Sequence, residues 1–122
     1  MKPSLILVAA LVMAAPIGPG HAAQQISFHV RTAGDLADLC APPANAPGTD
    51  AKLNYCDGFA QGAVALQLKL AGDKKPFCIP PGTGRRATMV QFSEWVRALP
   101  AHRGLEATDG LFQFLGERFP CK

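Results

Sequence analysis

Four cysteines constrain more than any other feature how this chain can fold. Cys40, Cys56, Cys78 and Cys121 are separated by 16, 22 and 43 positions. No pair therefore has the Cys-x-x-Cys spacing of a zinc ribbon, a thioredoxin-like centre or a haem attachment site. In an exported chain, an even number of cysteines favours two disulfides over four free thiols or a metal site.

The N-terminal residues have the three parts of a secretory signal peptide. Lys2 precedes an apolar run of 11 residues that begins at Leu5, and small residues follow up to Ala22 and Ala23. The run is well short of the roughly 20 residues needed to span a bilayer. We therefore predict a signal peptide over residues 1–22, cleaved after Ala22 or Ala23. The mature protein is expected in the periplasm, with no membrane contact.

The remaining residues, 23–122, suit one small domain. A domain of about 100 residues buries only around two-thirds of the surface of its unfolded chain, so it gains much from covalent cross-links. The whole chain has 12 Lys plus Arg against 9 Asp plus Glu. This excess of positive charge is too small to indicate nucleic acid as a partner.

Four cysteines can pair in three ways, and the sequence alone leaves all three open. We prefer Cys40 with Cys56, because this pair closes a proline-rich loop. We prefer Cys78 with Cys121, because this pair ties the chain end to its middle. Either disulfide is expected to contribute a large share of the stability, about 3 kcal/mol for the shorter loop in the chain-entropy model.

Apolar periodicity and helix-end signals predict a small all-α bundle of four or five helices stapled by two disulfides. Thr32 and Asp35 have the form of a capping box, which starts the first helix. Prolines in residues 41–48 end it. The helices are predicted at Ala33–Cys40, from about Thr49 to Ala71 with Gly72 as cap, from about Gly84 to Leu99, and from about Ala101 to Phe119.

The second helix is the longest and is expected to be central. Gly58 and Gly62 lie four residues apart, which predicts a neighbouring helix packed close to them. The expected core residues are, in the second helix, Leu53, Cys56, Phe59, Ala60, Ala63, Leu66, Gln67 and Leu70, in the third, Met89, Phe92, Trp95, Val96 and Leu99, and in the fourth, Leu105, Thr108, Leu111, Phe112, Leu115 and Phe119.

No motif for catalysis is visible. Paired carboxylates, a nucleophile with a base, a phosphate-binding glycine loop and spaced metal ligands are all missing from the sequence pattern. Glu94 and Glu106 have no obvious partner, and Gly82-Thr83-Gly84 is too short for a nucleotide loop. We therefore expect no catalytic residue, no metal and no cofactor, which is the pattern of a binding protein.

An ordered set of short motifs resembles the Rap/Tai family, the exported immunity proteins of bacterial type VI secretion. The motifs are Gly34 with Asp38-Leu39-Cys40, Cys56-Asp57-Gly58-Phe59 with Gly62, Phe77-Cys78-Ile79-Pro80, Trp95-Val96 with Leu99-Pro100, and Phe119-Pro120-Cys121. The likeness covers residues 32 to 121. It departs from the family pattern at Arg85-Arg86-Ala87-Thr88, at Ala101 after Pro100, and at Phe59, where tyrosine is usual.

The resemblance implies a small, helical, disulfide-bonded periplasmic protein that is often a homodimer. It implies that the chain binds a peptidoglycan-cleaving amidase effector and blocks the active site of that enzyme. No catalytic residues come with the family. The departures at residues 85–88 and 101 leave the fold unchanged and bear on which partner is bound.

Loops on a rigid scaffold commonly carry recognition, so residues 41–49, 72–83 and 99–103 are candidate contact segments. The first candidate anchors for the partner are Lys74, Lys75, Arg85 and Arg86. The alternative for each of these residues is an ordinary solvated charge.

A rival function is that of a small periplasmic stress protein, or holdase, resembling the acid-stress chaperones of the Hde type. Such a protein exposes apolar surface when it is acidified. The feature that separates the two hypotheses is charge. Few groups can change charge when this protein is acidified: nine carboxylates and the mature histidines His29 and His102. So few groups can shift the folding equilibrium only a little towards an opened form at acid pH.

Overall fold

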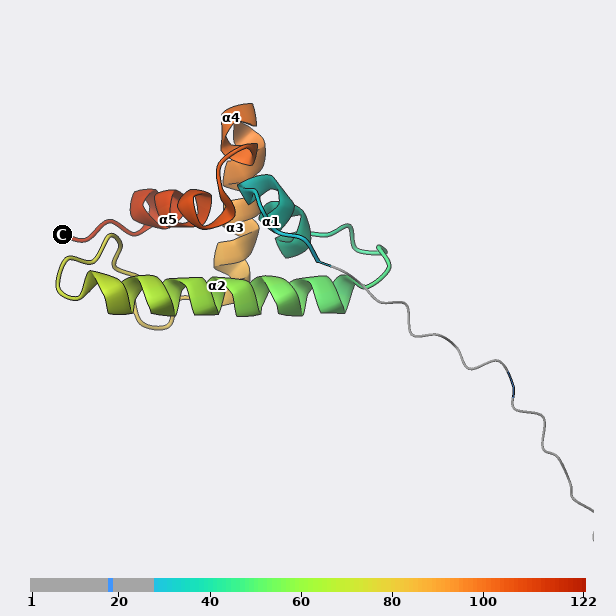
Figure 1. The fold of residues 1–122 in the computed structure, drawn as a ribbon, viewed down its shortest axis with the longest axis horizontal. Helices are drawn as coiled ribbons and strands as arrows, with labels where there is room; N and C mark the ends of the chain where they lie inside the picture. Colours follow the sequence, from blue (N-terminus) through green and yellow to red (C-terminus); the bar gives the residue numbers. More distant parts are fainter. Residues whose placement is uncertain (1–17, 19–27) are drawn as a thin grey trace, which may run out of the picture.

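The computed structural model describes residue 18 and residues 28–122, and the predicted signal peptide lies outside this part apart from Gly18. The described chain is helical (Figure 1), and it contains two disulfides. Its helices are α1 (Ala33–Cys40), α2 (Thr49–Ala71), α3 (Arg85–Ala98), α4 (Pro100–Arg103) and α5 (Ala107–Arg118). Residues 28–122 contain no strand beyond one isolated bridge between Thr32 and Glu106. The predicted all-α class is confirmed.

The capping box at the start of α1 is present as predicted. The Asp35 N–H donates to Thr32 Oγ1 at 3.1 Å, and the Thr32 N–H donates to Asp35 Oδ2 at 3.0 Å. Together these bonds satisfy two N–H groups that the first helical turn leaves without partners. The N–H bonds from Thr32 and Arg31 lower the pKa of the Asp35 carboxyl below its ordinary value.

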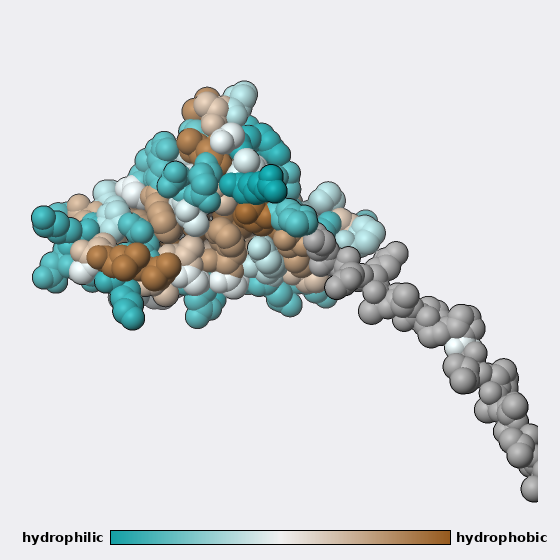
Figure 2. All heavy atoms as spheres, viewed as in Figure 1, coloured by the Kyte–Doolittle hydropathy of each residue, from teal (hydrophilic) through white to brown (hydrophobic). Residues whose placement is uncertain are grey.

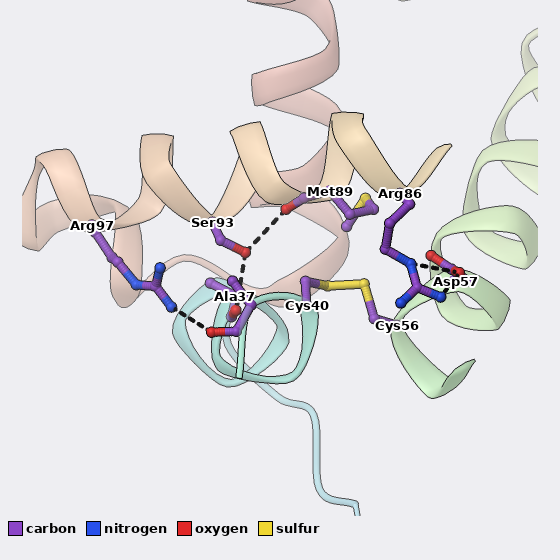
Figure 3. The surroundings of a disulfide bond; sticks show 9 residues. Ala37, Cys40, Cys56, Asp57, Arg86, Met89, Ser93 and Arg97 are labelled. Atoms are coloured by element: carbon purple, nitrogen blue, oxygen red, sulfur yellow. Dashed lines mark hydrogen bonds and ion pairs between the residues drawn. A yellow bond between two sulfur atoms is a disulfide. The ribbon is translucent and has the colours of Figure 1, made fainter. Parts of the chain in front are cut away.

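Helix α1 is the centre of the domain although it has only eight residues. It contacts each of the other four helices, and Ala33, Leu36, Ala37 and Cys40 have no exposed surface. The buried hydroxyl of Ser93, on α3, lies 3.0 Å from the carbonyl oxygen of Ala37, which gives that polar group a partner inside the core (Figure 3).

Two disulfides cross-link the bundle with the preferred connectivity. Cys40 at the end of α1 bonds to Cys56 on α2, and both side chains are fully buried (Figure 3). Cys78, before α3, bonds to Cys121 near the chain end, and both residues are exposed. One bond therefore holds two helices together inside the core, and the other holds the chain end to the segment before α3 at the surface.

Helix α2 lies along one side of the molecule (Figure 1), and its predicted core stripe is confirmed in part: Phe59 and Ala63 are partly buried against the core. Cys56 and Ala60 are its buried residues, whereas Leu66 and Leu70 are 58% and 74% exposed. The close helix neighbour predicted at Gly58 and Gly62 is also absent, because a Cβ at either position would meet no atom within 4 Å. The periodicity identified the helix and much of its covered stripe, but it did not show that the stripe is uncovered at Leu66 and Leu70.

The chain after α3 differs from the single helix predicted from about Ala101 to Phe119. It forms α4 and α5 instead, separated by residues 104–106. That segment pairs with the residues before α1: the Ala33 N–H donates to Leu105 O at 2.8 Å, and the Ala107 N–H donates to Arg31 O at 3.0 Å. Glu106 is the N-cap of α5, so it has partners after all.

An aromatic contact attaches the short helix α4 to α3, and a hydrogen bond from the same tryptophan joins α3 to α5. The His102 ring stacks on the Trp95 ring with their centroids 3.6 Å apart, and His102 Nδ1 lies 2.8 Å from the Trp95 carbonyl oxygen. The Trp95 indole N–H donates to the Glu117 carboxylate at 2.8 Å. His102 is thus half-buried and structural. Leu99, predicted in the core, is 54% exposed beside it.

Gly110 on α5 provides a test of how closely α5 packs on α1. A Cβ at Gly110 would lie 2.7 Å from the Ala33 Cβ, whereas a Cβ at Gly116 would lie 3.5 Å from its nearest neighbour, Pro76 O. We expect Gly110→Ala to lower the free energy of unfolding by about 1–3 kcal/mol through overpacking. Gly116→Ala in the same helix should leave stability unchanged or raise it by up to about 1 kcal/mol. Urea unfolding of both variants measures the difference, and equal effects would contradict the close approach.

Candidate functional site

The described surface contains an open groove of about 310 Å³ between α2, α3, α5 and the segment that precedes α3. Its floor is apolar and buried: Met89, Leu111 and Leu115 are each at most 2% exposed. The groove is lined by Ala60, Gln61, Val64, Ala65, Ile79, Thr83, Arg85, Thr88, Met89, Leu111 and Leu115.

The segment 77–84 forms one rim of the groove and is held at both ends. Phe77 is fully buried, and the Cys78 N–H donates to Phe119 O at 2.8 Å beside the Cys78–Cys121 disulfide. Further along, the Thr83 hydroxyl donates to Pro80 O at 2.7 Å. Gly82 closes this turn in the left-handed region, at a φ of 81°. The rim is therefore preformed.

The polar groups around the groove fall into two kinds. The hydroxyls of Thr83 and Thr88 donate to backbone carbonyl oxygens at 2.7 and 2.8 Å, so they are already satisfied. Gln61 and Arg85 are exposed, and within residues 28–122 neither side chain makes a hydrogen bond or an ion pair. Arg85 is the one charged residue in the groove lining.

Arg86, next along α3, has a different environment. Its Nε donates to Asp57 Oδ2 at 3.0 Å, and its Nη2 forms an ion pair with the same oxygen (Figure 3). Asp57 Oδ1 is buried without a hydrogen-bond donor in the described part of the chain. Since Asp57 follows Cys56, adjacent residues of α2 are bonded to α1 and to α3.

The four candidate anchors from the sequence do not form one cluster. Arg85 is at the groove, and Arg86 is paired with Asp57. Lys74 and Lys75 are exposed in the turn after α2. The three candidate loops also point to different ends of the molecule, with residues 41–49 at one end of α2, residues 72–83 at its other end and α4 at a third corner (Figure 1).

A second apolar surface lies on the part of α2 that turns away from the other helices, here called the outer face of α2. It consists of Gly58, Gly62, Leu66 and Leu70, all exposed. Figure 2 shows apolar atoms gathered over the C-terminal half of this helix. This surface is separate from the groove, which lies on the side of α2 toward α3 and α5.

Within the described part of the chain, no group of three or more His, Cys, Asp or Glu side chains could hold a metal ion. Among the helices of residues 28–122, none is long and apolar enough to cross a membrane. What the described surface offers is an apolar groove with one unpaired cation, and an exposed helix face.

Comparison with known proteins places the chain in a family. The family model of the Rap1a immunity proteins matches residues 32–121. The chain belongs to the Rap1a immunity protein family. No curated protein and no solved structure matched the chain.

Family membership confirms the resemblance drawn from the cysteine, glycine and proline motifs. The matched residues 32–121 contain every helix and both disulfides. Immunity protein families are generally non-enzymatic, and membership implies that this chain binds a partner effector protein. The disulfides and the family together indicate an exported protein.

Sequence reasoning missed most of the groove. Gln61, Ile79 and Thr88 come from α2, the rim segment and α3, and no spacing in the sequence relates them. The ion pair between Asp57 and Arg86 was missed for the same reason, since its partners are 29 residues apart. The one signal in the sequence for this ion pair was that the second and third predicted helices carry residues of opposite charge, Asp57 and Arg86.

Arg85 and Arg86 form a matched pair for separating recognition from stability. Arg86→Glu puts a second carboxylate beside Asp57, whose Oδ1 is buried, so we expect the free energy of unfolding to fall by about 1–2 kcal/mol. Arg85→Glu removes no hydrogen bond or ion pair of the described residues and should change the free energy of unfolding by less than about 0.5 kcal/mol. Urea unfolding at pH 7 measures both, and a larger loss for Arg85→Glu would contradict these roles.

Proposed function

We propose that this chain is a periplasmic immunity protein that binds a peptidoglycan-amidase effector of type VI secretion and inhibits it by blocking its active site. The observation that carries the proposal is the match of the Rap1a immunity family to residues 32–121. The predicted signal peptide over residues 1–22, ending at Ala22 or Ala23, agrees with action in the periplasm. The single domain over residues 23–122 is the inhibitor.

Inhibition by this chain needs no chemistry of its own, because a rigid protein that covers an enzyme's cleft excludes the substrate. Rigidity matters because a flexible loop must become ordered on binding, which costs free energy. A surface that is already ordered does not incur this cost when the partner binds. Two features supply it here: the buried Cys40–Cys56 disulfide fixes α1 against α2, and Cys78–Cys121 fixes the rim of the groove. Both features support tight, stoichiometric binding.

Among the four candidate anchors, the structure favours Arg85 for direct contact with the partner. Arg85 is exposed and unpaired at the groove. The guanidinium of Arg86 is already paired with Asp57, so Arg86 contributes by holding α3 against α2. The turn after α2 carries two exposed cations, Lys74 and Lys75. Their charge helps to attract an acidic partner at longer range.

The test is inhibition of purified amidases. The full chain is exported, purified oxidised from the periplasm and mixed with each peptidoglycan amidase that the source cell's type VI secretion system exports. We expect a one-to-one complex and loss of peptidoglycan cleavage in proportion to the inhibitor added. The control is the same protein unfolded by reduction and alkylation of its four cysteines. Full cleavage by every such amidase in the presence of excess folded protein would refute the proposal.

The proposal includes a homodimer formed through the outer face of α2. Leu66 and Leu70 are 58% and 74% exposed there, and a Cβ at Gly58 or Gly62 would meet no atom of the described residues within 4 Å, so a second copy of the helix can approach closely. Apolar residues exposed side by side typically mark an interface.

Light scattering after size exclusion tests the dimer. We expect the wild-type protein to have twice the monomer mass, because pairing would cover both leucines. The double variant Leu66→Glu, Leu70→Glu should be a monomer. Leu99→Glu, a matched change of a leucine that is 54% exposed on another surface, should remain a dimer. A monomeric wild type would contradict this interface.

A further inference from the structure

The groove between α2, α3 and α5 has features of a receptor for one kind of peptide segment. We propose that it takes a protruding segment of the partner protein in which an apolar side chain lies next to a carboxylate. The apolar side chain enters the groove and the carboxylate pairs with Arg85. This inference rests on the proposed function, since the effector is the partner, and adds the chemistry by which it is recognised.

The size and lining of the groove set the first requirement. Its volume of about 310 Å³ is roughly twice that of a 150 Å³ engineered apolar cavity that binds benzene. Met89, Leu111 and Leu115 form a floor that offers no polar side-chain group. One large apolar side chain therefore fits, together with part of a neighbouring residue, and its burial against this floor favours binding.

Charge sets the second requirement. Arg85 is the one charged residue of the lining, and its guanidinium is exposed and unpaired in the described structure. A guanidinium binds a carboxylate with two parallel hydrogen bonds, which fixes orientation as well as adding affinity. Because no acidic side chain lines the groove to compete for Arg85, the complementary ligand is acidic.

The remaining polar groups narrow the ligand further. The hydroxyls of Thr83 and Thr88 already donate to backbone carbonyl oxygens, so neither needs a ligand atom to accept its hydrogen. The exposed Gln61 amide is free and can both donate to and accept from a peptide backbone. An extended peptide segment satisfies Gln61, Arg85 and the apolar floor together, which a simple fatty-acid anion does not.

The experiment uses the oxidised, exported protein and a library of random seven-residue peptides displayed on phage. We expect the enriched peptides to carry Leu, Met or an aromatic residue beside Asp or Glu. The enriched peptide is then synthesised with a fluorophore, and its dissociation constant is measured by anisotropy. Arg85→Glu and the groove-filling Ala65→Trp should each weaken binding at least about tenfold, or about 1.4 kcal/mol, and Arg85→Lys should weaken it less.

Matched controls separate the groove from general surface effects. Ala98→Trp places the same side chain at the far end of α3, and Arg31→Glu makes the same charge reversal outside the groove; both positions are exposed. Both controls should bind like wild type. No enrichment, enriched peptides without an acidic residue, equal binding by Ala65→Trp, or binding of dodecanoate in place of peptides would overturn the inference.

The amidase assay distinguishes failure of this inference from failure of the proposed function. If wild type inhibits an amidase and Ala65→Trp inhibits it equally well, the function stands and the groove is not the contact. If peptides bind in the groove as expected but no amidase is inhibited, the groove assignment stands and the immunity proposal fails.

Discussion

The burial of α1 is the constraint on which the rest of the structure depends. An eight-residue helix is too short to be stable alone, yet α1 touches every other helix and has four side chains with no exposed surface. Its capping box fixes its start, the Cys40–Cys56 disulfide fixes its end, and Ser93 satisfies one of its carbonyl groups within the core. Removing any one of these would weaken the attachment of α1, and a domain of this size has little other buried surface to offset that loss.

The recognition surface follows from that arrangement. Because α1 fills the centre, α2 lies to one side and reaches the core with Cys56 and Ala60, which leaves space between α2, α3 and α5. Cys78–Cys121 and the turn at Gly82 hold the rim segment at the edge of this space. The exposed disulfide thus shapes the groove, while the buried one supports the fold.

Local signals were enough to predict the helices that have clear ends. Thr32 with Asp35 predicted the start of α1, the prolines of residues 41–48 predicted the gap before α2, and loop closure favoured the observed cysteine pairs. Apart from the disulfides, contacts between distant residues could not be predicted. The pairing of residues 104–106 with the chain before α1 splits the last helix. Likewise, only the packed structure shows that Leu66 and Leu70 are uncovered. The groove also depends on contacts between distant residues, since its lining comes from four separate segments.

A single photo-crosslinking experiment tests most directly whether the groove meets the effector. A benzophenone amino acid is placed at Gln61, on the exposed edge of the groove, and in a second strain at the exposed Ala98, at the far end of α3. Cells that express the type VI system are irradiated, and the crosslinked product is identified by mass spectrometry. We expect a peptidoglycan amidase crosslinked at position 61 and not at position 98. An amidase crosslinked at position 98 and not at position 61 would contradict the role of the groove.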